Sequence, residues 1–165
     1  MEISNDLTEA INEQINFELY SGYVYLSMAS WFEDNNLDGM AHWMKLQADE
    51  EYEHAMLFWD HVVDRGGKVI LKEVKGPKTE WESPLEAWQD AYEHELEVTE
   101  RIYNIGEMAE EQGDKATMAF LKWFYDEQVE EEEQTMKVRD LLEMIGDSKN
   151  ALLRLDEKLG QREEE

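Results

Sequence analysis

Apolar residues recur at steps of three and four along most of the chain, which is the spacing of one face of an α-helix. The same periodicity predicts helices over about 5–34, 37–65, 84–112 and 114–145, followed by a short helix over about 148–160. The first of these faces consists of Leu7, Ile11, Ile15, Glu18, Gly22, Tyr25, Ala29 and Phe32. Residues 68–74 are the only stretch with a trace of strand alternation. We therefore expect an all-α protein.

Residues that favour helix ends stand at the expected boundaries. Ser83, Pro84 and Glu86 supply an N-cap, a first-turn proline and the Ser-x-x-Glu capping box at the start of the third helix. Asp114 can cap the fourth helix, and Gly146 lies just past its end. These signals indicate that the periodic pattern consists of separate helices.

Between the second and third predicted helices lies a long segment, residues 66–83, without helical periodicity. Such a length is unusual for a loop inside a compact domain, so we interpret the segment as a crossover along the bundle. Short turns make the first and second helices, and the third and fourth, antiparallel, whereas the crossover makes the second and third parallel. We expect a single domain over residues 1–165: a four-helix bundle with one long crossover and a short fifth C-terminal helix.

A glutamate interrupts the apolar face of every long helix. These residues are Glu18, Glu51, Glu95 and Glu131, and His54 lies one turn beyond Glu51. Burying an isolated carboxylate costs several kcal/mol, and several in one core raise one another's pKa values. The pattern therefore predicts a positive group among them.

Two divalent cations would offset the charge of these carboxylates, with one glutamate bridging the pair. Carboxylates with a single imidazole suit iron or manganese, although zinc could also bind, and we favour Fe(II). The alternative is an acidic helical scaffold whose glutamates are exposed because the helical phase is misread.

Acidic residues outnumber basic ones by 41 to 15, giving a net charge of −26. This charge repels nucleic acid and anionic lipid and attracts cations, although adaptation to high salt explains a surface excess equally well. The chain has no cysteine, which excludes disulfides and thiolate ligands. It also lacks a basic leader and a long apolar run, so we expect a cytoplasmic protein without nucleic-acid or membrane partners.

Five segments carry a resemblance to a known family: "NEQINFELYSGYVYLSM", "ADEEYEHAM", "SPLEAWQDAYEHELEVT", "FLKWFYDEQVEEE" and "ALLRLDEKL". In combination they resemble the non-haem prokaryotic ferritins, nearly from end to end. The resemblance implies a ferritin-like fold and an iron-storage protein that oxidises Fe(II) with O₂ or H₂O₂ at a di-iron ferroxidase centre. A di-iron oxidase or peroxidase without storage is the rival enzyme class.

The resemblance also implies a set of ligands. Glu18, Glu51 and His54 would hold the first iron, and Glu51, Glu95 and Glu131 the second, with Gln128 beside it. A third, less defined iron site would use Glu50, Glu127 and Glu130, or these acids form a solvated face.

Further residues match the family or depart from it. Tyr25 matches a tyrosine near the di-iron centre and could donate a hydrogen bond or an electron, or simply pack in the core. Trp123 matches a ferritin tryptophan. Tyr52 stands where bacterioferritins carry a haem-ligating methionine, so we expect no haem. Gln134 stands where a second Glu-x-x-His motif would place its histidine, which argues against a bacterioferritin or a rubrerythrin-like centre.

Storage needs a container. The resemblance implies a homo-oligomeric shell of about 24 copies, with the fifth helix contributing subunit contacts. A net charge of −26 per chain would make the copies repel one another, so assembly should depend on salt.

Overall fold

The computed structural model describes residues 1–165 and contains five α-helices. The four long helices are α1 (Asn5–Asp34), α2 (Asp38–Asp64), α3 (Pro84–Gln112) and α4 (Lys115–Ile145). A short helix, α5 (Lys149–Leu159), follows. No helix combines the length and the apolar character that crossing a membrane requires.

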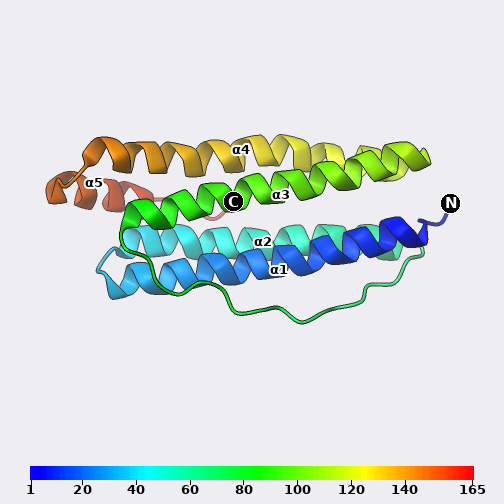
Figure 1. The fold of residues 1–165 in the computed structure, drawn as a ribbon, viewed down its shortest axis with the longest axis horizontal. Helices are drawn as coiled ribbons and strands as arrows, with labels where there is room; N and C mark the ends of the chain where they lie inside the picture. The colour runs from blue at the N-terminus through cyan, green and yellow to red at the C-terminus, as the bar shows by residue number, and fades with distance from the viewer.

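The long helices form two antiparallel pairs, α1 with α2 and α3 with α4, and the pairs stack into one elongated bundle (Figure 1). The connection from α2 to α3 passes along α1 from one end of the bundle to the other, so α2 and α3 run in the same direction. The all-α bundle with a single long crossover is thus confirmed. Residues 68–74 form no strand.

Side chains of α1 hold the crossover against the bundle. The Asn12 amide donates to the Lys68 carbonyl at 2.9 Å and accepts from the Ile70 amide at 3.1 Å. Farther along, the Ser27 hydroxyl donates to the Lys78 carbonyl at 2.6 Å. These bonds satisfy backbone groups of a segment that has no ladder of its own.

The helix ends follow the capping chemistry of the sequence. Ser83 Oγ accepts from the Glu86 amide at 3.1 Å, and Asp114 Oδ1 accepts from the Thr117 amide at 3.0 Å. The Glu86 carboxylate accepts from the Glu82 amide at 2.5 Å, so the return bond of the capping box lies one residue earlier than the motif implies. Gly113 ends α3 with φ of +67°, a left-handed conformation that glycine adopts without steric cost.

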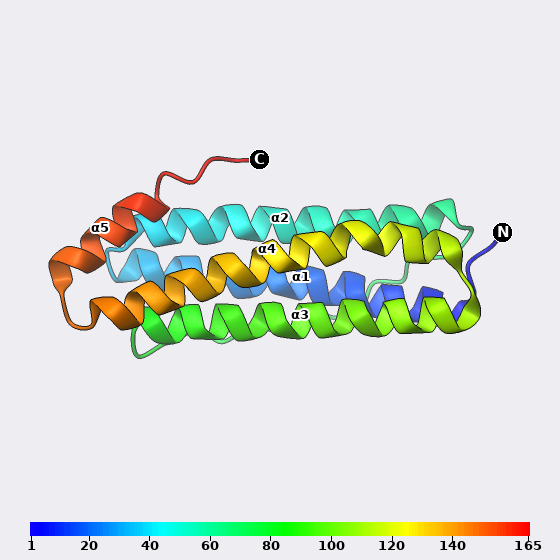
Figure 2. The ribbon, with the colours of Figure 1, turned by 90° about the horizontal axis from the view of Figure 1, so that it is seen from above.

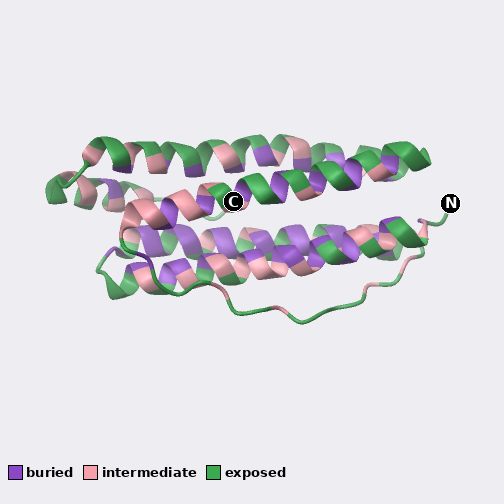
Figure 3. Ribbon diagram, in the orientation of Figure 1, coloured by how far each residue is buried: buried purple, intermediate pink, exposed green.

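Buried residues occur along all four long helices (Figure 3), and the apolar ones form two clusters, one toward each end of the bundle. Tyr25, Phe32, Met44 and Trp88 belong to the cluster at the α5 end. Leu7, Ile11, Phe58, Ile102 and Phe124 belong to the cluster at the end nearer the N-terminus. The segments between the clusters carry the glutamates of the sequence pattern, so two apolar blocks enclose a polar layer.

Candidate metal centre

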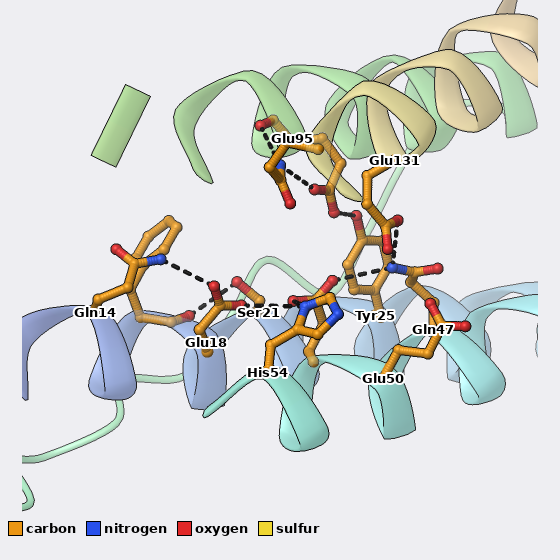
Figure 4. A network of polar contacts seen from close by, with 12 residues as sticks. Gln14, Glu18, Ser21, Tyr25, Gln47, Glu50, His54, Glu95 and Glu131 are labelled. Atoms are coloured by element: carbon orange, nitrogen blue, oxygen red, sulfur yellow. Dashed lines mark hydrogen bonds and ion pairs between the residues drawn. The ribbon is translucent and has the colours of Figure 1, made fainter. Parts of the chain in front are cut away.

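The four glutamates come together between the two apolar clusters, one from each long helix, and Figure 4 shows Glu18, Glu95 and Glu131 among them. Relative exposure is 0% for Glu18, 1% for Glu51, 0% for Glu95 and 2% for Glu131. We call these residues the central carboxylate layer. Their burial shows that the helical phase deduced from the sequence was correct, so the scaffold alternative with exposed glutamates is wrong.

His54 lies inside this layer with 4% exposure. Its Nδ1 atom is 3.4 Å from Glu51 Oε2 and 4.0 Å from Glu18 Oε2. The structure brings together two groups whose ligand atoms lie within 4.8 Å of one another: Glu18, Glu51 and His54, and Glu51, Glu95 and Glu131. Glu51 belongs to both groups, as a bridging ligand must.

Two oxygen atoms of the layer are buried without a hydrogen-bond partner, Glu18 Oε2 and Glu51 Oε2. An unpaired buried oxygen is costly, and nearly all such atoms in folded proteins find a partner. Both atoms lie on the side of His54, whose Nδ1 is their nearest cationic neighbour. Carboxylate oxygens beside one imidazole are a donor set that suits divalent iron, so these residues fit a pair of cations.

Burial sets the protonation of the layer. It raises the pKa of Glu18 well above its ordinary value, and Glu51 adds to the effect. Burial and Glu51 raise the pKa of Glu95 to about 8, and burial and Glu95 raise the pKa of Glu131 well above the usual range. Burial also opposes ionisation of Glu51, but the neighbouring His54 outweighs it and lowers the pKa of Glu51 to about 2. Against its own burial, the pKa of His54 is raised to about 8, chiefly by Glu51. At neutral pH the metal-free layer therefore holds one ionised acid beside an imidazolium.

Three buried glutamines orient the carboxylates. Gln14 Nε2 donates to Glu18 Oε1 at 3.0 Å. Gln47 Nε2 donates to Glu51 Oε1 at 3.0 Å and to Glu131 Oε2 at 2.8 Å. The third, Gln128, donates from Nε2 to Glu95 Oε2 at 3.1 Å.

The sequence reasoning found Gln128 but missed Gln14 and Gln47. Each missed glutamine stands four residues before a glutamate of the central carboxylate layer, Gln14 before Glu18 and Gln47 before Glu51. Side chains four apart on a helix are neighbours, so this spacing was a signal that could have found both residues.

Tyr25 is fully buried and its hydroxyl donates to Glu95 Oε1. Burial raises the pKa of Tyr25 well above its usual value, as do the nearby glutamates, so the phenol stays protonated as a donor. His94 packs edge-on against the Tyr25 ring and is hydrogen-bonded to Ser21 Oγ at 2.7 Å. The His94 ring is partly enclosed by the bundle.

The acids of the predicted third site are distributed differently. The structure groups Glu127 with His54 and Glu131 within 4.8 Å, whereas Glu130 is exposed. Glu50 forms an ion pair with Arg162 at 2.8 Å. The ligand set of a third site therefore stays a prediction.

A cleft of about 310 Å³ reaches the layer from outside, with His54, Glu127 and Trp123 among its lining residues. Trp123 is 47% exposed, and its ring meets the His54 ring edge-on at 5.5 Å. The cleft offers cations a path between solvent and His54.

Comparison with known proteins agrees with this geometry. The sequence pattern of the ferritin-like domain matches residues 8–145. Bacterial non-heme ferritins of Staphylococcus saprophyticus and Staphylococcus haemolyticus are 39% and 40% identical to the chain over 160 residues, which is 97% of this chain and 96% of each relative.

Among solved structures, the chain is similar to one described as a novel open pore ferritin from the hyperthermophilic archaeon Archaeoglobus fulgidus. The two chains are 48% identical with a TM-score of 0.97, and the match covers 98% of this chain and 100% of the other. A structure described as an engineered closed form of the same archaeal protein matches with the same identity and TM-score.

Proposed function

The chain belongs to the ferritin family, as a non-haem iron-storage protein with ferroxidase activity, and from this premise we propose which of its residues oxidise and store iron. The central carboxylate layer is the ferroxidase centre in this proposal. The observation that carries it is the pair of buried, unpartnered oxygens of Glu18 and Glu51 at the edge of His54. Fe(II) is the substrate that would satisfy them.

In the proposed centre, Glu18, Glu51 and His54 receive one Fe(II), and Glu51, Glu95 and Glu131 receive the other. Gln128 lies beside the second position and orients Glu95 through its 3.1 Å hydrogen bond. Tyr25 holds the other oxygen of Glu95 and is placed to supply a hydrogen bond or an electron. Crystals soaked with Fe(II) and measured by anomalous scattering at the iron edge test these positions, and peaks elsewhere would reject them.

The protein residues act by changing their protonation as iron arrives. The acids with raised pKa and the His54 imidazolium must lose their protons, which makes the layer anionic only when Fe(II) is present to balance it. Each Fe(II) gives one electron to O₂ or H₂O₂. Carboxylates are hard ligands and stabilise the higher charge of Fe(III), so the same residues favour the oxidised product.

Fe(III) then leaves toward the cleft that contains Glu127, and we propose that Glu50, Glu127 and Glu130 assist this transfer as a third site. About 24 copies would enclose a mineral in a shell whose acidic inner wall concentrates cations. A cytoplasmic location and the lack of haem remain predictions from the sequence.

The storage function is tested by adding Fe(II) aerobically and following both the oxidation rate and the iron retained per particle. Storage predicts rapid oxidation with iron that stays with the shell through gel filtration. Turnover without retention would instead indicate a di-iron oxidase or peroxidase, and the absence of both would reject the proposed centre.

A further inference from the structure

The chain after α5 turns back along α2 (Figure 2), and Arg162 of this segment contacts Gln47 next to the metal centre. The carboxylate of Asp156 anchors α5 by accepting from the backbone amides of Gly39 at 3.2 Å and Met40 at 2.7 Å. At residue 39 only glycine fits this docking, because a Cβ there would lie 1.8 Å from the Asp156 carbonyl oxygen. The position of the C-terminal segment is thus fixed by the first turn of α2.

This C-terminal segment places Arg162 against α2. Its guanidinium carbon lies 4.3 Å from the centre of the Trp43 ring, and its Nη1 donates to the Trp43 carbonyl at 3.2 Å. Nη1 also donates to Gln47 Oε1 at 3.1 Å, and Nη2 is 2.8 Å from Glu50 Oε1. With 14% exposure of its side chain, Arg162 is an ordered, largely enclosed cation rather than a free surface charge.

Gln47 joins this cation to the centre. Its side chain is fully buried, and its two ends have different partners: Oε1 faces Arg162, while Nε2 donates to both Glu51 and Glu131. An amide is planar, so a donor that holds its oxygen also fixes the direction of its NH₂ group. Arg162, Gln47 and two carboxylates therefore form one continuous hydrogen-bond chain.

We propose that Arg162 is a positioning residue of the metal centre, acting through the Gln47 amide to hold Glu51 and Glu131 in place for the second ion. This inference rests on the proposed ferroxidase centre. It also predicts which ion is affected: both carboxylates that Gln47 holds belong to the second group, whereas the first group shares only Glu51 and keeps Glu18 and His54.

The sign of the effect separates positioning from simple electrostatics. A positive charge beside a cation site repels the cation, so removal of Arg162 should tighten metal binding if charge alone mattered. Positioning predicts the opposite, because groups that orient metal ligands typically contribute about 10- to 100-fold to metal affinity. Arg162→Gln should therefore lower the affinity for the second ion by about tenfold and leave the affinity for the first ion within about twofold of the wild type.

The experiment titrates the assembled protein with Zn(II), a redox-inert probe, by calorimetry, and with Co(II), whose visible spectrum reports ligand geometry. Arg154→Gln is the matched control, since it removes the same charge from an exposed position on α5. Thermal melts and gel filtration establish that both variants fold and assemble. The expected result is that Arg162→Gln alone binds the second ion more weakly and shows an altered Co(II) spectrum.

A double-mutant cycle with Gln47→Met tests the route. If Arg162 acts through Gln47, the Arg162→Gln change has no further effect in the Gln47→Met background. The same loss in both backgrounds would overturn the inference, as would wild-type or tighter binding of the second ion in Arg162→Gln. Failure of the wild-type protein to bind two ions would instead reject the proposed ferroxidase centre.

Discussion

Two pairs of adjacent glutamates, Glu50 with Glu51 and Glu130 with Glu131, contrast two regions of the same bundle. Glu51 and Glu131 are nearly inaccessible, whereas the side chain of Glu50 is 18% exposed and Glu130 lies at the surface. One residue along a helix turns a side chain by about 100°, which is enough to move it from the core to the surface. Identical chemistry thus enters two different environments.

The environment decides what each carboxylate can do. In the central carboxylate layer, burial raises the pKa of Glu18 and Glu131 and leaves oxygens of Glu18 and Glu51 without partners. Glu50, by contrast, is paired at 2.8 Å with Arg162, which cannot act as a metal ligand, whereas the cationic neighbour of Glu51 is His54, which can give up its proton to a metal. A cation gains far more from ligands that nothing else satisfies, so the number of acids in a region does not by itself define a site.

The largest effect should come from Glu51→Ala compared with its neighbour Glu50→Ala. Glu51 is shared by both ligand groups, so its loss should slow Fe(II) oxidation by about 100-fold or more, whereas Glu50→Ala should slow it by no more than about threefold. Stopped-flow absorbance under air measures both rates. Wild-type oxidation by Glu51→Ala would show that the bridging assignment is wrong.

Folding provides the control for this comparison. Removal of Glu51 takes away the ion-pair partner of His54, whose buried imidazole can then stay neutral, so the variant should remain helical with only a modest loss in melting temperature. Circular dichroism of the metal-free proteins tests this expectation. An unfolded variant would call for the isosteric Glu51→Gln change instead.

A change of pH should alter metal binding at the central carboxylate layer. The pKa of Glu95 is raised to about 8 by burial and Glu51, and the pKa of His54 is raised to about 8 by Glu51. As pH falls from 8 to 6 these ligands take up protons that Zn(II) must displace, so affinity at the layer should fall by about tenfold or more per pH unit. Glu51, with a pKa of about 2, stays ionised throughout and adds no dependence.

Calorimetry in buffers of different ionisation enthalpy measures the protons released on Zn(II) binding. Net proton release is expected at pH 7, because burial raises the pKa of Glu18, Glu95 and Glu131, and Glu51 raises that of His54. Binding without proton release would show that the metal-free acids are already ionised.

The periodicity of the sequence predicted the central layer because each of its glutamates stands on an apolar stripe whose phase is set by several neighbours. Glu95, for example, lies between Trp88 and Ile102, which are both fully buried. The phase of a long helix is over-determined in this way, and the side chains on the stripe must face the core. The fold and the buried acids followed from the same pattern.

Residues at the edges of the stripes could not be placed in the same way. Glu50 and Glu127 are partly buried, and their partners depend on packing angles that periodicity does not contain. Arg162 follows the last helix, where no repeat constrains the chain, and its contact with Gln47 spans 115 positions. Such contacts depend on tertiary docking, here the capping of α2 by Asp156.

A smaller effect is expected from His54→Ala, which removes one neutral ligand rather than a bridging carboxylate. Of the two groups that share Glu51, His54 belongs to the first. Zn(II) titration should therefore show an affinity for the first ion lowered by about tenfold and an affinity for the second ion nearly unchanged. His61→Ala, on the same helix but hydrogen-bonded to Thr117 outside the layer, is the control. Two-ion binding equal to the wild type would remove His54 from the ligand set.

The smallest effect on the metal centre is expected from salt, which should act mainly on the exposed acids. The surface acids contribute most of the net charge of −26, and ions screen exposed charges beyond about 10 Å at 0.1 M ionic strength while buried groups are screened much less. Raising NaCl should therefore shift gel-filtration profiles toward assembled particles, while the initial oxidation rate per chain changes by no more than about twofold. Identical particle populations at low and high salt would mean that surface repulsion does not limit assembly. An oxidation rate that followed salt as steeply as assembly did would mean that the central layer is complete only within the shell, because its buried ligands would then depend on contacts that screening controls.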